Sequence, residues 1–213
     1  MNRNTALIVF LVAGALALVV GIVTNRVDDV DREVAAIEAP EGSPTTVAPA
    51  PQQTFTPLAE APPVLRPAPD LVELDGWLQS DATTLAEARG DVTILQFWTF
   101  ACRNCKNTLD TVARIYDTYE ADGLEVVGVH APEFDFEADP ARIAEEAVAL
   151  GVDWQIALDT EKTNFRSWQE GRRFWPRTYI IDSAGNIRYD WIGEGNYDEL
   201  EATVAWLLEN PGA

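Results

Sequence analysis

Residues 92–105, VTILQFWTFACRNC, join an apolar run to the only two cysteines of the 213-residue chain. The run VTILQFW (92–98) is rich in β-branched and aromatic residues and is apolar on both faces, which is typical of a buried strand. Apolar residues then recur at helical spacing from Leu109 to Tyr119. The stretch therefore predicts a strand that leads directly into a helix, with the cysteines at the turn between them.

The position of the two cysteines predicts redox chemistry. Cys102 is expected at the start of the helix, where the helix dipole and free backbone N–H groups stabilise a thiolate. Cys105 follows one helical turn later, so its sulfur is expected beside the first. Such a pair can exchange with a disulfide, with Cys102 attacking and Cys105 resolving the mixed disulfide. A strand followed by CxxC and a helix is a far more specific signal than CxxC alone.

Three alternatives to redox chemistry remain at the level of sequence. A structural staple is disfavoured because the bond would close a very short loop. A structural zinc site needs four ligands, usually Cys or His, and the chain offers two Cys and the single His130, so we expect no metal. Incidental cysteines are the third alternative. His130 ends an apolar run and is expected to be a structural residue rather than a catalytic base.

The remainder of the C-terminal part alternates between strand and helix patterns. The order of strand, helix, strand, helix, hairpin and helix predicts an α/β fold in which helices flank a mixed central sheet. Besides the elements above, the expected elements are a strand at 124–130, a helix at 139–151, a hairpin of 178–182 and 186–193, and a helix at 197–209.

The N-terminal third differs in composition from the rest. Residues 6–23 are eighteen consecutive residues without a charge, long enough for a membrane-spanning helix, so residues 1–25 are interpreted as a transmembrane anchor. A cleaved signal peptide is the alternative. Nine of the thirteen prolines fall between residues 40 and 69, which predicts a disordered, proline-rich linker over 26–69 and a folded domain over 70–213.

The charge of the chain limits its partners. With 35 acidic and 15 basic residues the formal net charge is −20, which argues against binding to nucleic acid or to an anionic lipid surface. Lys and Arg are nearly balanced on the two sides of the apolar segment and do not decide its orientation. The cysteine chemistry favours a catalytic domain outside the cytoplasm.

Several segments resemble a known family. The segment ILQFWTFACRNC resembles the active-site segment of the thioredoxin superfamily, and WPRTYIID (175–182) resembles its cis-proline loop and following strand. Together with VVGVHAPEFDFE (126–137) and WIGEGNYDELE (191–201), they resemble membrane-anchored TlpA/ResA-like thioredoxins. The similarity covers residues 74–209 and is greatest to the extracytoplasmic redox domain of DipZ-type proteins. It implies a thioredoxin-like fold.

The resemblance also implies roles for individual residues. Cys102 would be the exposed nucleophile, Cys105 the buried resolving thiol, and Pro176 a cis-proline that faces them. Trp175 would present its backbone to a substrate strand, and Trp98 is the second expected substrate contact. An ordinary trans proline is the alternative for Pro176. No cofactor is implied.

Gln96, Thr108 and Asp110 depart from the pattern of the family, and the first of these departures leads to a further expectation. Thioredoxins have a buried Asp where this chain has Gln96, and a neutral amide cannot accept the proton of Cys105. The strands at 92–98 and 124–130 should be parallel, so the loop after the second strand leaves the sheet beside the cysteines. Glu133 in this loop is therefore predicted to be the proton acceptor, and a solvated loop glutamate is the alternative.

The sequence predicts an extracytoplasmic thiol–disulfide oxidoreductase that is anchored in the membrane. We expect it to reduce the disulfides of protein clients, with electrons supplied by a membrane thiol relay, and cytochrome c-type biogenesis is one role that the family suggests. A disulfide oxidase or isomerase is the alternative within the class. A non-catalytic redox-sensing module is the alternative outside it.

Overall fold

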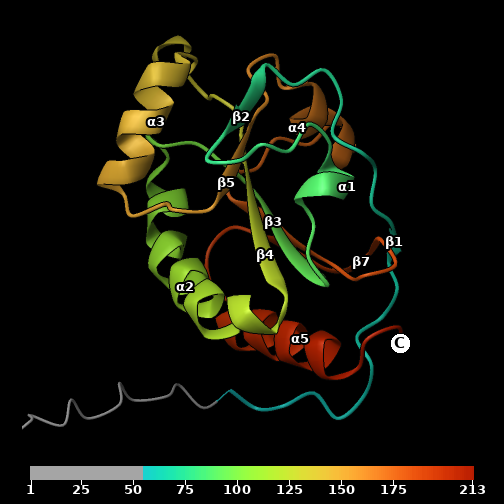
Figure 1. The fold of residues 1–213 in the computed structure, drawn as a ribbon. Coiled ribbons are helices and arrows are strands. Elements are labelled where there is room, and N and C mark those ends of the chain that lie inside the picture. Colours follow the sequence, from blue (N-terminus) through green and yellow to red (C-terminus); the bar gives the residue numbers. More distant parts are fainter. Residues whose placement is uncertain (1–54) are drawn as a thin grey trace, which may run out of the picture. The chain divides into compact units, whose positions relative to one another are not determined.

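The computed structural model describes residues 55–213, so the predicted anchor and linker residues 26–54 lie outside them. Residues 55–213 form a seven-stranded sheet in the order β1-β7-β6-β3-β4-β5-β2 (Figure 1). The central strand β3 (Val92–Trp98) pairs parallel with β4 (Leu124–His130) and antiparallel with β6 (Arg177–Ile181). The mixed sheet flanked by helices confirms the predicted fold class. Within residues 55–213, no helix combines the length and apolar character needed to cross a membrane.

The long elements follow the sequence prediction, whereas the short ones were not predicted. An element of two to six residues spans too few positions for its hydrophobic period to be visible. The unpredicted elements are β1 (Arg66–Pro67), β2 (Gly76–Leu78), α1 (Leu85–Ala88), β5 (Gln155–Leu158) and α4 (Thr163–Trp168). The 3-10 turns η1 (Glu120–Asp122) and η2 (Asp135–Glu137) were not predicted either. The remaining elements are α2 (Arg103–Tyr119), α3 (Pro140–Ala149), β7 (Asn186–Ile192) and α5 (Tyr197–Glu209).

Helices cover both faces of β3. Ile94 and Trp98 belong to a buried cluster with residues of α2, α3 and α5, whereas Leu95 and Phe97 belong to a second cluster with residues of α1 and α4. All seven residues of β3 are buried. Burial on both faces explains why this strand is mainly apolar rather than alternating, with Thr93 and Gln96 as its two polar residues.

The connection from β3 to β4 places the cysteines. Helix α2 lies between these two strands in the chain, and the strands are parallel in the register Trp98↔His130. Their carboxyl ends therefore lie at the same edge of the sheet, where the Ala131 N–H donates to the Trp98 carbonyl at 3.0 Å. This places the turn before α2 beside the loop that follows β4, as the sequence predicts.

The folded part begins earlier than the predicted boundary at residue 70. The buried guanidinium of Arg188 donates to the Pro62 carbonyl at 3.1 and 2.7 Å, and β1 pairs with β7 through Arg66 and Pro67. Proline is tolerated on an edge strand, because its missing N–H removes no bond to an inner neighbour. Proline-rich composition alone therefore does not distinguish a free linker from a segment held at a sheet edge.

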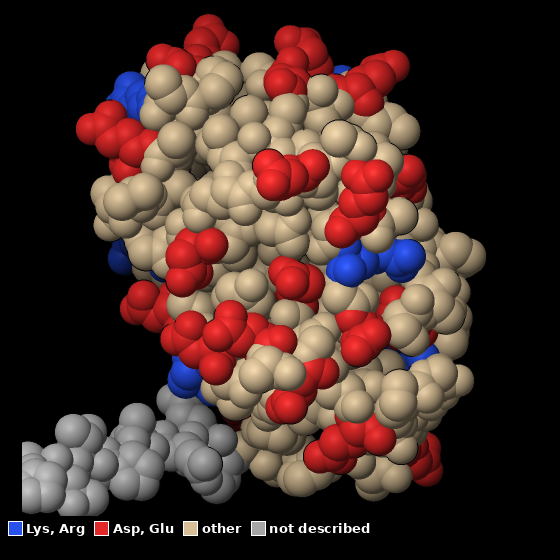
Figure 2. All heavy atoms as spheres, viewed as in Figure 1, with Lys and Arg blue, Asp and Glu red and all other residues tan. Residues whose placement is uncertain are grey.

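The surface of the domain is acidic. On the face shown in Figure 2, acidic side chains are spread over the whole area rather than gathered in one patch. An acidic surface of this kind favours solubility and repels phosphates and anionic lipids.

Candidate active site

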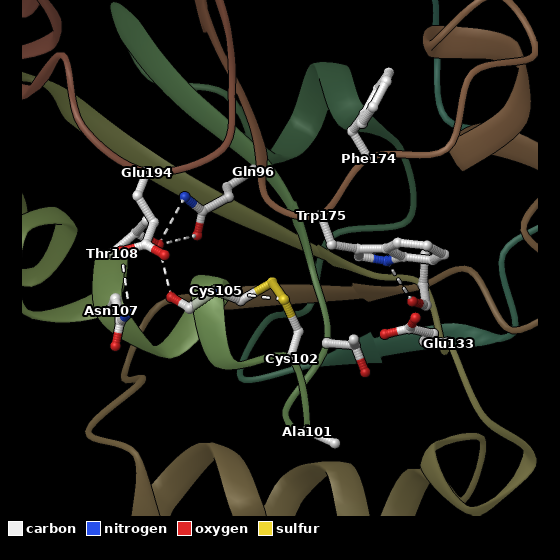
Figure 3. The surroundings of a disulfide bond; sticks show 12 residues. Gln96, Ala101, Cys102, Cys105, Asn107, Thr108, Glu133, Phe174, Trp175 and Glu194 are labelled. Atoms are coloured by element: carbon white, nitrogen blue, oxygen red, sulfur yellow. Dashed lines mark hydrogen bonds between the residues drawn. A yellow bond between two sulfur atoms is a disulfide. The ribbon is translucent and has the colours of Figure 1, made fainter.

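The two cysteines lie at the start of α2. Cys102 is the N-cap residue, and its sulfur accepts a hydrogen bond from the Cys105 N–H at 3.2 Å. A disulfide joins the two residues, whose Cα atoms are 5.3 Å apart (Figure 3). Cys102 is half-buried, whereas Cys105 has no exposed surface. The sulfur within reach of another molecule is therefore that of Cys102. Among residues 55–213 no group of three or more His, Cys, Asp or Glu is arranged to hold a metal ion.

The loop before β6 reaches the same edge of the sheet. Because Arg177 is paired with Phe97 in the antiparallel register, Pro176 lies at the carboxyl end of β3. The peptide bond between Trp175 and Pro176 is cis. The half-buried Trp175 indole donates to the Ala131 carbonyl at 2.9 Å and stacks on Phe165 with ring centroids 4.1 Å apart. This loop is thus tied to the loop after β4, and contact of Trp175 with substrate stays a prediction.

Trp98 is buried, so the substrate contact predicted for it is wrong. Trp98 is only 1% exposed and packs edge-on against His130, with ring centroids 5.4 Å apart. It shares with Ile94 the face of β3 that α2 covers, so the indole points into the core. Gly128 lies against it, and a Cβ added there would be 2.8 Å from the indole nitrogen. Trp98 shapes the core beneath the site and cannot contact a substrate.

A neutral hydrogen-bond network surrounds Gln96. The Gln96 amide is buried and donates to the hydroxyls of Thr108 at 3.2 Å and Thr178 at 3.0 Å. Thr108 in turn donates to the Cys105 carbonyl at 2.7 Å (Figure 3). These groups hold the first turn of α2 on the sheet, but none of them is a carboxylate.

Glu133 lies in the loop after β4 but is exposed. Figure 3 shows it on the Trp175 side of the disulfide. The backbone of Glu133 is held in place, because its N–H donates to a carboxylate oxygen of Glu137 at 2.7 Å. A role for Glu133 as proton acceptor stays a prediction.

Glu137 is the residue of this region that the sequence reasoning missed. It is completely buried, and one carboxylate oxygen accepts from the Thr99 hydroxyl and from the Ala101 N–H at 3.0 Å. The other oxygen accepts from the N–H groups of Glu133 and Phe134 at 2.7 and 2.8 Å. The bond to the Phe134 N–H is the glutamate half of a capping box, but the N-cap residue Phe134 has no side-chain acceptor, so the sequence carries no capping-box signature at this position.

His130 lies behind the cysteine turn as a neutral residue. It is 1% exposed, stacks on Phe100, and its Nε2 is 3.2 Å from the Thr99 hydroxyl oxygen. Because that hydroxyl donates to Glu137, Nε2 carries the ring proton. Burial lowers the pKa of His130 from 6.5 to about 4, against the opposing charge of Glu137. These contacts agree with the predicted structural role.

The buried His130 predicts that stability falls on acidification. Below pH 6.5 the unfolded chain binds a proton at His130, whereas the folded chain does not until about pH 4, so stability falls over that window. Between pH 7 and pH 5 the loss from this residue should be roughly 2 kcal/mol. We expect the free energy of unfolding of His130→Phe, measured in urea at the two pH values, to fall by roughly 2 kcal/mol less than that of the parent. Equal losses of stability in the two proteins would contradict the assignment of His130 as a buried residue that is neutral in the folded protein.

The fold and the site together define a class of protein. A thioredoxin-like α/β domain with a cysteine pair at the start of the helix after its central strand is a thiol–disulfide oxidoreductase, and the chain is an enzyme of this class. The family model of the AhpC/TSA family matches residues 64–190. The chain therefore belongs to the AhpC/TSA family.

Individual relatives agree with this membership. Protein DipZ from Mycobacterium bovis is 39% identical over 147 residues, which cover 67% of this chain but only 21% of DipZ. Thiol-disulfide oxidoreductase YkuV from Bacillus subtilis is 27% identical over 143 residues, covering 67% of this chain and 95% of YkuV. A solution structure of a thioredoxin-like protein in the oxidised form has a TM-score of 0.59 and 27% identity, and the match covers 68% of this chain and 95% of that one. The chain spans about one fifth of the length of DipZ.

Proposed function

We propose that the chain is a membrane-anchored, extracytoplasmic enzyme that reduces disulfides in proteins. The observation that carries this proposal is the accessible Cys102 sulfur at the N-terminus of α2, with the fully buried Cys105 one turn later. The helix start favours the thiolate of Cys102, which is the attacking species. Residues 1–25 are the proposed anchor, and electrons are supplied by the dithiol of a membrane protein.

The proposed reaction transfers two electrons from the enzyme to the client. The Cys102 thiolate attacks one sulfur of the client disulfide, the client S–S bond breaks, and the leaving client thiolate takes up a proton. Cys105 loses its proton and attacks the Cys102 sulfur, which forms the intramolecular disulfide and releases the second client thiol. The disulfide in the structure is then the product state, and a membrane dithiol reduces it again.

The surroundings of the pair favour polypeptide clients over small disulfides. Phe134 and Phe136, in the loop after β4, are 53% and 47% exposed and stack with ring centroids 5.6 Å apart. Phe174, in the loop before Pro176, is 42% exposed. Exposed aromatic side chains in these two loops offer apolar contacts that a small thiol compound does not need. Cytochrome c-type biogenesis, which requires reduced cysteine pairs, is one process that such a reductase would serve.

One labelling experiment tests both direction and location. A membrane-impermeant, mass-adding maleimide is applied to intact cells, and the protein is then extracted under denaturing acid. We expect most of the protein to gain the tag before lysis, because a reductase outside the cytoplasm is kept reduced and is within reach of the reagent. A variant with both Cys102 and Cys105 replaced by Ser controls for other sites.

The other outcomes of the labelling each contradict one part of the proposal. Protein that is tagged only after reduction with dithiothreitol was oxidised in the cell and acts as an oxidase. Protein that is reduced but tagged only after lysis has its cysteines in the cytoplasm.

A further inference from the structure

The buried carboxylate of Glu137 joins two segments that are far apart in the chain. It contacts Thr99 and Ala101 in the turn before Cys102, and Glu133 and Phe134 in the loop after β4. The Ala101 N–H that it binds belongs to the residue immediately before the nucleophile. Glu137 is therefore placed to influence both the position and the charge environment of Cys102.

The hydrogen bonds indicate that Glu137 is in its carboxylate form. Three of its four partners are backbone N–H groups, which can only donate, and the Thr99 hydroxyl is placed to donate as well, a set of contacts that suits a carboxylate. A carboxylate with several backbone N–H donors is stable even when fully buried. Its neighbour His130 is neutral, so this residue supplies no positive charge to offset that of Glu137.

Two other charged residues at this edge of the sheet are buried, and both have partners: the Asp159 carboxylate accepts from the N–H groups of Asn164 and Phe165, and Arg177 is paired with Asp190 at 2.7 Å. The remaining charged groups around the cysteine turn are exposed or half-buried. Glu194 is held by the Asn107 amide at 3.0 Å, and the guanidinium of Arg142 lies over the rings of Phe100 and Phe136 at 5.4 and 5.1 Å. Water and salt screen exposed charges, whereas a buried charge acts with little screening. The exposed or half-buried charged residues of this region are Arg103, Lys106, Glu133, Asp135, Arg142, Lys162 and Glu194.

We infer that Glu137 is a positioning residue that also opposes formation of the Cys102 thiolate and so makes the pair a stronger reductant. The carboxylate occupies the N–H of Ala101, the residue before Cys102, and so places a buried negative charge on the turn whose sulfur must itself become negative. A less stable thiolate destabilises the reduced form relative to the disulfide, so the pair gives up its electrons more readily. This inference rests on the proposed role of Cys102 as the reacting thiol.

The test uses Glu137→Gln, which keeps the size of the side chain and removes its charge. We expect the pH midpoint of Cys102 alkylation by iodoacetamide to fall, because the thiolate no longer forms beside an anion. In a glutathione redox buffer the ratio of reduced to oxidised protein should rise on the order of tenfold, the factor that corresponds to one pKa unit. The exposed Asp135→Asn, the same charge change two residues earlier, is the matched control and should shift neither quantity.

A second variant keeps the inference testable if Glu137→Gln does not fold. Thr99→Val removes one donor from Glu137 and leaves its three backbone N–H partners in place. Less of its charge is then compensated, so the alkylation midpoint should move to higher pH, opposite to the shift in Glu137→Gln. Unchanged midpoints, or shifts in the same direction, would overturn the inference. A parent protein that does not exchange disulfides at all would instead overturn the proposed function.

Discussion

Replacement of Cys102 by Ser is expected to reduce disulfide exchange to the uncatalysed level, while Cys105→Ser traps clients as mixed disulfides. Cys102 is the sulfur at the surface, so without it no bond to a client can form. Cys105 is fully buried and is needed only to release the client from Cys102. The Cys105→Ser variant should therefore complete the first attack and stop there.

The measurement is a non-reducing gel of cell extracts, together with turnover of a model protein disulfide by the purified domain. Mixed-disulfide bands should accumulate with Cys105→Ser and be absent with Cys102→Ser and with the double variant. Equal trapping by both single variants would mean that Cys105 also reaches clients, against its complete burial. Trapping without any turnover by the parent protein would favour the redox-sensing alternative.

The central part of the fold could be predicted because its signals are local. Each residue of β3 is buried, and the mainly apolar composition of residues 92–98 follows directly from that burial. The same run predicts a strand but does not say which side chains point to the surface. Trp98 is an example, because its position on the face covered by α2 depends on where the helix packs. The substrate contact predicted for it was wrong for that reason.

The candidate site could be predicted only as far as the loops that form it. The topology placed the loop after β4 beside the cysteine turn, and the structure has it there. The side chain that bonds to the turn is that of Glu137, through contacts to Thr99 and Ala101 that span 38 and 36 residues of sequence. Such pairings depend on the tertiary fold and leave no periodic pattern in the sequence.

Loss of the buried Arg188 is expected to destabilise the domain by about 3–5 kcal/mol, the usual cost of breaking a buried ion pair. The Arg188 and Asp182 side chains are 2% and 7% exposed and are 2.9 Å apart. Arg188 also donates to the carbonyls of Pro62 and, at 2.8 Å, Ala213. In Arg188→Met the carboxylate of Asp182 stays buried without its partner, and the segment that begins at Pro62 loses its attachment.

Urea unfolding and limited proteolysis measure the two consequences separately. We expect the free energy of unfolding at pH 7 to fall in Arg188→Met, and cleavage to appear within residues 55–65. The control is Arg142→Met, whose ion pair with Glu146 spans 3.9 Å and is partly exposed, so its loss should cost less than about 1 kcal/mol. Similar losses in the two variants would show that burial does not determine the effect.

The pH dependence of the loss identifies its cause. Burial alone would raise the pKa of Asp182, but hydrogen bonds from Asn186 and Arg188 outweigh burial and hold the pKa below its usual value. In the parent the stabilisation that the ionised Asp182 provides is therefore present at neutral pH and is lost as the pH falls through its folded pKa. Without Arg188 the buried carboxylate becomes easier to protonate, so the difference between parent and Arg188→Met should shrink on acidification. Asp182→Asn in the Arg188→Met background should restore part of the stability at pH 7, because it removes the unpaired charge. A loss that is independent of pH and is not rescued would instead assign the effect to the contacts with Pro62 and Ala213.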